Sequence, residues 1–405
     1  MDLFTFPHKK FFPALTLSIA VMFSSCAKTN SDSNEQQSST TPSTSLTRVA
    51  VVATAAADYS SGAHSILSYS APRQAQNDLL PTGSDLRMSS YGKFFYRIEG
   101  SHSHSVTKFS IDDPSTPIWQ FSTEGTEVKS FPYSIVFVNE TKAYLIRNGS
   151  PKIWIINPSA RTEAEFKTGE LDLSSYDDGD GSPEAASGLI FGNKLFVALQ
   201  RLDMNNWGAP TNPAYIAVFD ITTDTETDTH QGDPGFKGIK LDIRNPGGPT
   251  GKIKYYDGYL YIPGADDLFG GSANGGIQKI NITTYEPDHS IIQSGQHITN
   301  VEVVSSTKGY FIQYDPIFVA PWASTYLRSF NPQTGVVNPG NVAGIGDNND
   351  RNINYIVKDD SDLLWVADSS LTNPGIYIID PATDLIQEGP ISTNLNPVEI
   401  TFCEK

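Results

Sequence analysis

Short apolar stretches recur along the chain, and each ends in Asn, Asp or Ser with Thr, Ser or Pro close behind. An Asn, Asp or Ser side chain at the end of a strand can hydrogen-bond the backbone two residues on and so close a turn. The pattern therefore predicts β-strands that each end at a fixed anchor residue. The copies lie at residues 66–71, 106–112, 153–158, 216–223, 277–284, 326–334 and 376–383.

A second pattern precedes each anchor: a tight turn followed by an aromatic or apolar strand, as at 192–199 and 257–262. Tight turns between such strands are typical of hairpins. Each repeat is therefore expected to contain strand A, a tight turn, strand B, a variable loop, strand C with its anchor, and strand D. Repeats of about fifty residues with several short strands indicate a β-propeller, so the sequence predicts an all-β, seven-bladed β-propeller.

The first repeat lacks an A strand, because residues 47–54 already have the pattern of strand B and 65–70 that of strand C. The missing strand is predicted at the other end of the chain. Residues 396–402 resemble the A strand at 132–137, so the C-terminal strand should close blade one. Closure leaves no open strand edge around the ring. The propeller is expected to span residues 47–405 as one domain.

Two blades resemble a known group, the seven-bladed propellers of the YVTN-repeat type. The resemblance is carried by residues 143–150 followed by 153–158, and by 364–368 followed by 376–383. The other blades depart from the repeat, mostly by long insertions, although the resemblance covers nearly the whole mature chain. This scaffold hosts binders, interaction platforms and a few enzymes, so the resemblance implies a fold and leaves the function open.

The N-terminus has the pattern of a secretory signal: Lys9 and Lys10, an apolar run over 11–23, and Ser-Ser-Cys ending at Cys26. A Cys at this position resembles a bacterial lipobox, which predicts a lipoprotein signal peptide over 1–25 and lipid on Cys26. Two alternatives stay open, an ordinary signal peptide with an incidental Cys and an uncleaved anchor. The apolar run is short for a membrane span.

The segment from 26 to 46 is almost wholly polar after Cys26, so it is expected to form a flexible tether rather than part of a core. A tether behind a lipidated Cys predicts a lipid-anchored protein of the bacterial cell envelope that touches the membrane through its anchor alone. The two residues after Cys26 give no retention signal for the inner membrane, which favours the outer membrane. The leaflet is not predicted.

The formal charge is −17 and becomes −18 when cleavage of the signal peptide removes Lys9, Lys10 and Asp2. An acidic surface disfavours nucleic acid and anionic lipid head groups as partners, and it suits cations, neutral sugars, peptides or a basic protein. Cys403 has no partner for an internal disulfide if Cys26 carries lipid, and a small buried side chain is expected there. No dimerisation element is evident, so the expected state is a monomer.

Loop lengths are uneven, because insertions collect in the B–C and D–A connections, which open on the same face of a propeller. Such a face is commonly the binding face. Its loops carry aromatic side chains beside Asn and Asp, which suit a sugar ring or another flat ligand. The alternative is that these side chains pack the loops onto the scaffold. The candidate ligand-binding residues are Arg201, Asp203, Trp207, Asp266, Asp267, Phe269, Tyr314 and Trp322.

Two groups of residues suggest metal sites. His64, His102 and His104 are predicted to converge on a transition metal such as zinc or copper, unless they are simply exposed histidines. Asp178 and Asp180, in the segment 177–184, resemble part of a calcium loop, although the full twelve-residue pattern is absent. An acidic turn in solvent is the alternative. The possible cofactors are therefore Ca²⁺ or a transition metal.

These observations favour capture of a small ligand, such as a corrinoid, a metal chelate or a glycan, over two alternatives. One alternative is a protein–protein interaction platform in an envelope complex. The other is a divalent-cation-dependent hydrolase or lyase acting on a lactone or glycan, although no recognised catalytic motif stands in a suitable structural context. A concave pocket lined by the loop aromatics would favour capture, and a broad acidic face would favour the platform.

Overall fold

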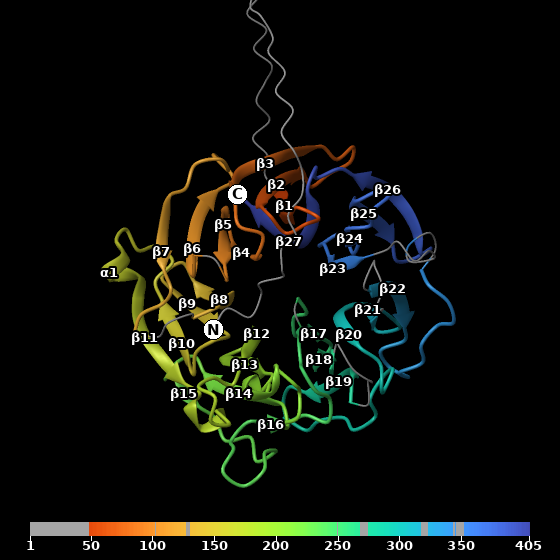
Figure 1. Ribbon diagram of the computed structural model, residues 1–405. Coiled ribbons are helices and arrows are strands. Elements are labelled where there is room, and N and C mark those ends of the chain that lie inside the picture. The colour runs from red at the N-terminus through yellow and green to blue at the C-terminus, as the bar shows by residue number, and fades with distance from the viewer. Residues whose placement is uncertain are drawn as a thin grey trace, which may run out of the picture. The chain divides into compact units, whose positions relative to one another are not determined.

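The computed structural model describes residues 48–101, 103–126, 130–248, 250–267, 274–316, 323–342, 345 and 352–405. The described residues form seven antiparallel sheets, which stand as blades around a central axis (Figure 1). This confirms the prediction of an all-β, seven-bladed β-propeller. Four residues singled out from the sequence lie outside the described residues: Cys26, His102, Phe269 and Trp322.

Each blade is numbered in chain order, and its strands run from the axis outward as A to D. Blades one to three contain β27 (Asn396–Glu404), β1 (Arg48–Ala55), β2 (Gly62–Ser68) and β3 (Ala75–Thr82); β4 (Leu86–Tyr91), β5 (Phe94–Glu99), β6 (Ser105–Ser110) and β7 (Trp119–Ser122); and β8 (Pro132–Asn139), β9 (Lys142–Arg147), β10 (Lys152–Ile156) and β11 (Lys167–Asp172).

Blades four to seven follow the same order, and two of them have three assigned strands in the described residues. They contain β12 (Ala185–Phe191), β13 (Lys194–Leu199), β14 (Tyr215–Asp220), β15 (Thr225–Glu226) and β16 (Ile239–Lys240); β17 (Lys254–Tyr256), β18 (Tyr259–Gly264) and β19 (Gly276–Asn281); β20 (Ile298–Ser305), β21 (Lys308–Pro316) and β22 (Ala323–Phe330); and β23 (Ile353–Lys358), β24 (Leu364–Asp368), β25 (Gly375–Asp380) and β26 (Leu385–Ile391).

Short helices interrupt the connections of blades three and four. They are α1 (Glu163–Phe166) and the single-turn helices η1 (Ser174–Tyr176) and η2 (Met204–Asn206). Among the described residues, none of the helices is long and apolar enough to cross a membrane.

The C-terminal strand closes the ring as predicted. β27 pairs antiparallel with β1, with Arg48 opposite Glu404 and Ala55 opposite Asn396. Blade one thus takes its innermost strand from the C-terminal end and its other three strands from the N-terminal end. Cys403 of β27 is buried and its Sγ lies 3.6 Å from Phe94 O, while burial raises the pKa of the thiol to about 12. Cys403 is therefore a packed thiol that stays protonated at neutral pH.

The predicted anchors close turns at the ends of the C strands. Asp220 Oδ1 accepts a hydrogen bond of 2.9 Å from Thr222 N, and Asn281 Oδ1 accepts one of 2.9 Å from Thr283 N. Asn157, Asn331 and Asp380 make the same contact two residues on. In these five repeats the anchor therefore forms an Asx turn that links strands C and D.

Two anchored turns also clasp the preceding blade. Tyr144 of blade three donates to Asp224 Oδ1 of blade four at 2.5 Å, and Lys142 Nζ lies 2.8 Å from the same oxygen. Blade six repeats the arrangement on blade seven, with Tyr310 2.5 Å from Asp384 Oδ1 and Lys308 paired with Asp384. A Lys-x-Tyr segment at the start of strand B thus ties one blade to the next.

Seven hydrophobic clusters lie between neighbouring blades, one at each of the seven contacts around the ring. The cluster between blades seven and one joins Trp365 to Ile400, and the one between blades one and two joins Val51 to Phe95. Because each blade is covered on both sides, its B and C strands are almost continuously buried.

The ring has two faces with different connections. The long-loop face carries the B–C and D–A connections, including residues 200–214 and 173–184. The A–B face carries the tight A–B turns and the C–D turns. β1 begins and β27 ends on the A–B face, because they are strands B and A of blade one.

Candidate functional site

The long-loop face carries the most exposed large apolar side chains among the described residues. They are Trp207, Leu371 and Tyr59, with 85%, 74% and 70% of their surface exposed. All three stand in B–C connections, in blades four, seven and one. Large apolar side chains that hold no place in a core commonly mark a contact surface.

Trp207 is held outward by the backbone around it. It follows η2 in the left-handed conformation, with φ 59°, and Asp203 caps the start of that helix by accepting a 3.1 Å hydrogen bond from Asn206 N. A non-glycine residue in this conformation is uncommon and is held there by its surroundings. Asp203, predicted as a ligand-binding residue, thus shapes the loop that presents Trp207.

The acidic loop, residues 177–184 in the D–A connection between blades three and four, supports the Trp207 loop through hydrogen bonds. Asp180 Oδ2 accepts a 2.9 Å hydrogen bond from Met204 N, and Glu184 Oε2 accepts one of 2.9 Å from Leu202 N. Asp178 is bonded to the Asn212 amide at the other end of the same loop. Changes in the charge of the acidic loop therefore act directly on the backbone that carries Trp207.

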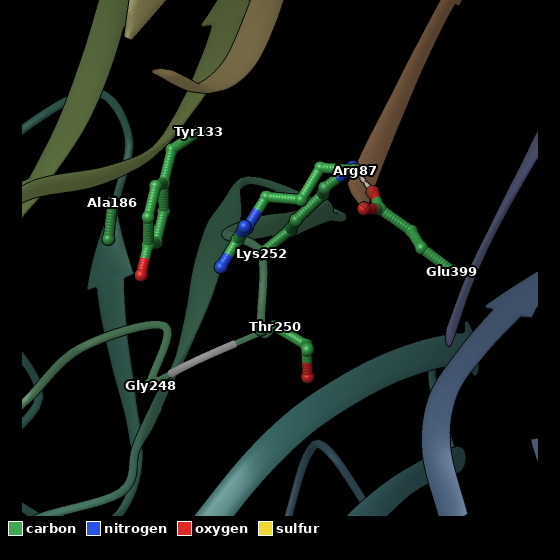
Figure 2. A pocket seen from close by; sticks show the side chains of 8 residues that line it. Arg87, Tyr133, Ala186, Gly248, Thr250, Lys252 and Glu399 are labelled. Carbon is green, nitrogen blue, oxygen red and sulfur yellow. Dashed lines mark hydrogen bonds and ion pairs between the residues drawn. The ribbon is translucent and has the colours of Figure 1, made fainter. Parts of the chain in front are cut away.

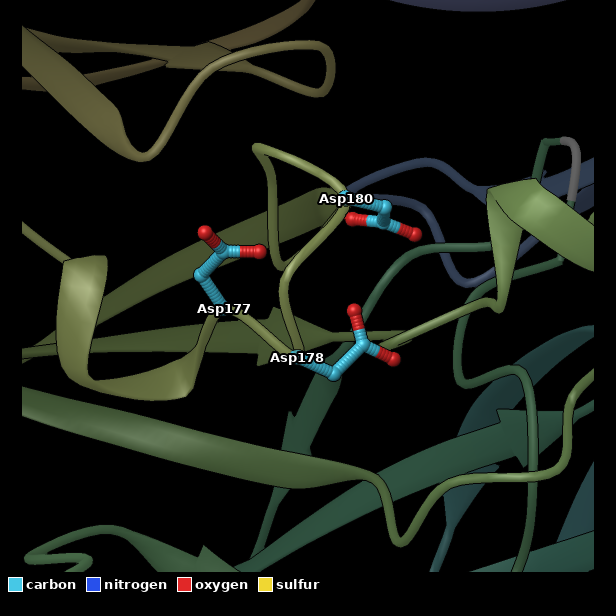
Figure 3. A group of neighbouring side chains, drawn as sticks. All are labelled: Asp177, Asp178 and Asp180. Carbon is cyan, nitrogen blue, oxygen red and sulfur yellow. The ribbon is translucent and has the colours of Figure 1, made fainter.

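Three carboxylates of the acidic loop, Asp177, Asp178 and Asp180, lie together (Figure 3). One oxygen from each lies within 4.8 Å of the others. Asp177 Oδ1 also accepts hydrogen bonds of 3.0 Å from Gly179 N and Gly181 N, which fold the loop around it. Calcium takes six to eight oxygen ligands, so these carboxylates would supply part of its shell. Calcium binding at Asp178 and Asp180 stays a prediction.

Glu184, at the end of the same acidic loop, is almost completely buried, with 3% of its surface exposed. Burial, reinforced by the negative charge of Asp180, raises the pKa of its carboxyl to about 9. Burial and the charge of Asp180 also raise the pKa of Asp178. At neutral pH Glu184 is therefore protonated, so the loop carries less negative charge than its composition implies.

Arg201 braces the loops instead of facing solvent. Its Nε donates to Tyr176 O at 2.8 Å and one terminal nitrogen donates to Pro213 O at 2.9 Å. The guanidinium also lies over the Phe236 ring, 5.1 Å from its centroid. These contacts connect η1, the Trp207 loop and the D–A connection of blade four.

The other predicted loop residues are dispersed. Asp266 is buried and its Oδ2 accepts a 3.0 Å hydrogen bond from Asn274 N, while Asp267 beside it is half-buried. Tyr314 is half-buried in blade six, with its ring edge-on to His297 at 6.3 Å between centroids. Tyr314 and Trp207 line neither the cavity at the axis nor the cavity between blades two and three.

His64 and His104, two of the three histidines predicted to bind a metal, lie in different surroundings. His64 is fully buried between Phe95 and Phe109, with Nε2 2.8 Å from Pro114 O, and burial lowers its pKa to about 4. His104 is also buried, and its Nδ1 accepts a 3.3 Å hydrogen bond from Phe131 N. The structure thus packs these two imidazoles against protein groups, and His102 lies outside the described residues.

A group of charged and aromatic side chains that the sequence did not predict lies where the A strands of several blades meet at the axis. A cavity of about 10 Å³, the size of one water molecule, is lined by side chains from several blades, among them Arg87, Tyr133, Lys252 and Glu399 (Figure 2). Arg87 stacks on the Tyr133 ring at 3.8 Å and pairs with Asp85 at 2.7 Å. Lys252 pairs with Glu399 across the ring.

A larger cavity of about 280 Å³ opens between blades two and three, near the outer edge. Trp154 and Phe166 line it, together with the charged Glu124, Glu163 and Lys167. The cation of Lys167 lies 4.7 Å from the Trp154 ring centroid, so that ring is partly covered.

No family of known proteins and no curated protein matches this sequence. Among solved structures, the chain is similar to BamB from Moraxella catarrhalis, with 14% identity and a TM-score of 0.43 over 77% of this chain and 80% of that one. It is also similar to AztD from Citrobacter koseri, with 12% identity and a TM-score of 0.44 over 88% and 98%. A catalytically inactive virginiamycin B lyase from Staphylococcus aureus, solved with quinupristin, gives 11% identity and a TM-score of 0.47 over 80% and 93%. No function is carried over from likenesses at this level.

Proposed function

We propose that this protein is an envelope-anchored interaction platform that binds a protein partner on its long-loop face. The observation that carries the proposal is the placement of Trp207, Leu371 and Tyr59, the three most exposed large apolar side chains described, on that one face. Blade four lies across the ring from blades seven and one. A ligand that reaches all three side chains must therefore span the axis, which suits a protein surface.

Charge supports a partner with basic groups. The mature chain is strongly acidic, and the long-loop face includes the carboxylates of Asp177, Asp178 and Asp180 close to Trp207. Complementary charge chiefly raises the rate of association and the specificity, while buried aromatic anchors supply most of the affinity. A basic partner with apolar pockets for Trp207 and Leu371 fits this face.

Capture of a small ligand has weaker support. Pockets for drug-sized ligands and cofactors have volumes of roughly 300–1,000 Å³. The axial cavity holds about 10 Å³, and the cavity of about 280 Å³ lies near the outer edge, away from the predicted aromatic residues. Phe269 and Trp322, two of the predicted ligand contacts, lie outside the described residues, so capture of a corrinoid, a metal chelate or a glycan stays a prediction. The hydrolase or lyase alternative would depend on a cation at the acidic loop.

We also propose that lipid on Cys26 anchors the protein in the bacterial envelope, with the outer membrane favoured. The support is the sequence pattern of 1–26. Replacing Cys26 with Ser should move the mature protein from the membrane fraction to the soluble fraction.

Site-specific photo-cross-linking in the native host tests the platform. A benzophenone amino acid is placed in turn at Trp207, Leu371 and Tyr59, and at Val336 as the control. Val336 is 62% exposed but lies in the C–D turn of blade six, on the opposite face. The proposal predicts one and the same protein adduct from the first three positions and not from Val336. Adducts absent at all three positions, or shared equally with Val336, would refute it.

A further inference from the structure

Aromatic side chains gather at the ends of the inner strands on the A–B face. Tyr91, Phe191, Tyr255 and Tyr259 are each 36% to 41% exposed, and they come from blades two, four and five. Phe191 packs on Tyr255 at 4.3 Å between ring centroids, and Tyr91 stacks on Phe137 of blade three at 5.3 Å. We call these five residues the aromatic rim. It spans four consecutive blades.

The described part of the chain begins beside this rim. Arg48, at the start of β1, pairs with Glu404 at the end of β27. Glu404 N donates a 3.0 Å hydrogen bond to Gly92 O, in the turn that follows Tyr91. The described part of the chain therefore begins on the A–B face, next to one end of the rim.

Lysines on the A–B face are paired with carboxylates around the rim. Lys194 lies 3.0 Å from Asp220, Lys142 lies 2.8 Å from Asp224, and Lys93 lies 2.8 Å from Asp112. The long-loop face instead holds the three clustered carboxylates of the acidic loop. The paired lysines therefore offset the negative charge of their partner carboxylates around the rim.

We propose that the aromatic rim rests on the lipid surface to which the chain is tethered; this rests on the proposed lipid anchor at Cys26. The sequence of residues 27–46 is predominantly polar and is predicted to be a tether, and a flexible linker of that length has a root-mean-square span of about 25 Å. Such a short link holds the A–B face near the bilayer. Tyr side chains prefer the boundary between head groups and acyl chains, because the ring is apolar and the hydroxyl group tolerates water, and the Phe rings beside them add apolar surface to the same boundary. The long-loop face is then directed away from the membrane, toward its partner.

Spin labels on the two faces of the lipidated full chain test this placement. The labelled variants are Glu140→Cys, in the A–B turn of blade three, and Asn206→Cys, beside Trp207. Both positions are exposed, and Cys403 is buried. Each protein is reconstituted in phosphatidylcholine vesicles, and the collision of the label with oxygen and with a water-soluble nickel chelate is measured. Flotation of the vesicles reports the lipid anchor separately.

The proposal predicts that the Glu140 label gains contact with oxygen and loses contact with nickel severalfold on vesicles, while the Asn206 label does not change. Adding Phe191→Ser and Tyr255→Ser should reverse the effect at Glu140 without changing flotation. Flotation with equal nickel contact at both labels would overturn the proposal and leave the anchor intact. Failure to float would refute the lipid anchor instead. Shielding of the Glu140 label only when envelope proteins are added would show that the rim binds protein, and would also overturn the proposal.

Discussion

Single side chains on the long-loop face are set by the network beneath them. Glu184 and Asp180 accept hydrogen bonds from the backbone of the loop that presents Trp207, so the protonation of Glu184 and the position of that loop are connected. Arg201 and Asp203 brace the same loop. Arg201 and Asp203, which the sequence suggests as ligand contacts, thus support the loop that holds Trp207 outward.

Glu184 should make stability depend on pH in the neutral range. Its pKa is about 9 in the folded protein against an ordinary 4.5, so the folded state holds the proton more tightly. Its contribution to stability is complete below about pH 4.5 and is lost as pH rises through 9, by up to about 1.4 kcal/mol per pH unit. Chemical unfolding of the wild type and Glu184→Gln between pH 5 and 9, with a chelator present, should show a flatter profile for the variant. Parallel profiles would contradict this, and the exposed Glu163→Gln is the control.

Calcium should stabilise the protein if the acidic loop binds it. A ligand that binds the folded state alone raises the free energy of unfolding by about 2.7 kcal/mol at one hundred times its dissociation constant. We expect calcium to raise the Tm of the wild type and to have no effect on an Asp178→Asn, Asp180→Asn double variant. An equal Tm for the wild type with calcium or with a chelator would contradict calcium binding.

At the scale of elements, each blade depends on its neighbour through three kinds of contact. Asx turns fix the C–D connection within a blade, hydrophobic clusters fill the contact between blades, and the Lys-x-Tyr clasps join strand B to the next blade's turn. The clasp needs Asp224 and Asp384 in the left-handed conformation, with φ 54° and 59°. Asp tolerates this conformation better than most residues do.

Removing one hydroxyl from a clasp should measure its contribution. Tyr144→Phe keeps the buried ring but deletes the hydrogen bond to Asp224, which leaves part of a charge-assisted pair unmade. We expect a loss of about 1–3 kcal/mol in the free energy of unfolding. Tyr310→Phe should cost a similar amount, because it removes the same bond to Asp384. Tyr259→Phe, at an exposed position, is the control, and equal stability of all three variants would contradict a role for the clasp.

At the scale of the whole molecule, β27 completes blade one and so closes the ring of blades. Around the axis, pairs of opposite charges join one blade to another. Lys252 pairs with Glu399, and Lys254 Nζ lies 2.6 Å from Glu302 Oε2. Burial opposes the charge of Lys254, but Glu302 outweighs it and raises the pKa of Lys254. The first pair joins blades five and one across the axis, and the second joins the neighbouring blades five and six.

Replacing one partner of the Lys254–Glu302 pair should lower the free energy of unfolding more than replacing both partners. Lys254→Met leaves the buried Glu302 carboxylate unpaired, for which we expect a loss of about 3–5 kcal/mol in the free energy of unfolding. Adding Glu302→Leu should recover most of that loss, because no buried charge is then left alone. Denaturant unfolding of the two single variants and the double variant checks this. Additive losses would contradict the coupling.

The fold was predictable because its signals are local and repeated. The anchors at Asp220 and Asn281, the tight turns and the strand B predicted at 47–54 without a preceding strand A together predict seven blades and their closure. The candidate site was predictable only as a set of residues. Trp207 stands out in a long loop, and Asp178 and Asp180 lie close together in sequence, so the sequence singles them out, while their binding roles stay predictions.

The axial group and the fate of the histidines could not be read from the sequence. Arg87, Lys252 and Glu399 come from three blades, and their meeting depends on how the ring closes. His64 lies in a strand of mixed polar and apolar residues, and its position in the sequence does not tell whether it faces a neighbouring blade or solvent. Leu371 and Tyr59 stand out only when exposure is known.

The size of the native complex tests the platform most directly. Mild extraction of the host envelope, followed by native size separation, compares the wild type with a Trp207→Ser, Leu371→Ser, Tyr59→Ser variant. All three changes replace exposed side chains, so the fold should be unaffected, which an unchanged Tm would verify. We predict that the wild type migrates in a complex with a second protein and that the variant migrates alone. A wild type that migrates alone, or a variant that keeps the complex, would contradict a protein-binding site on the long-loop face.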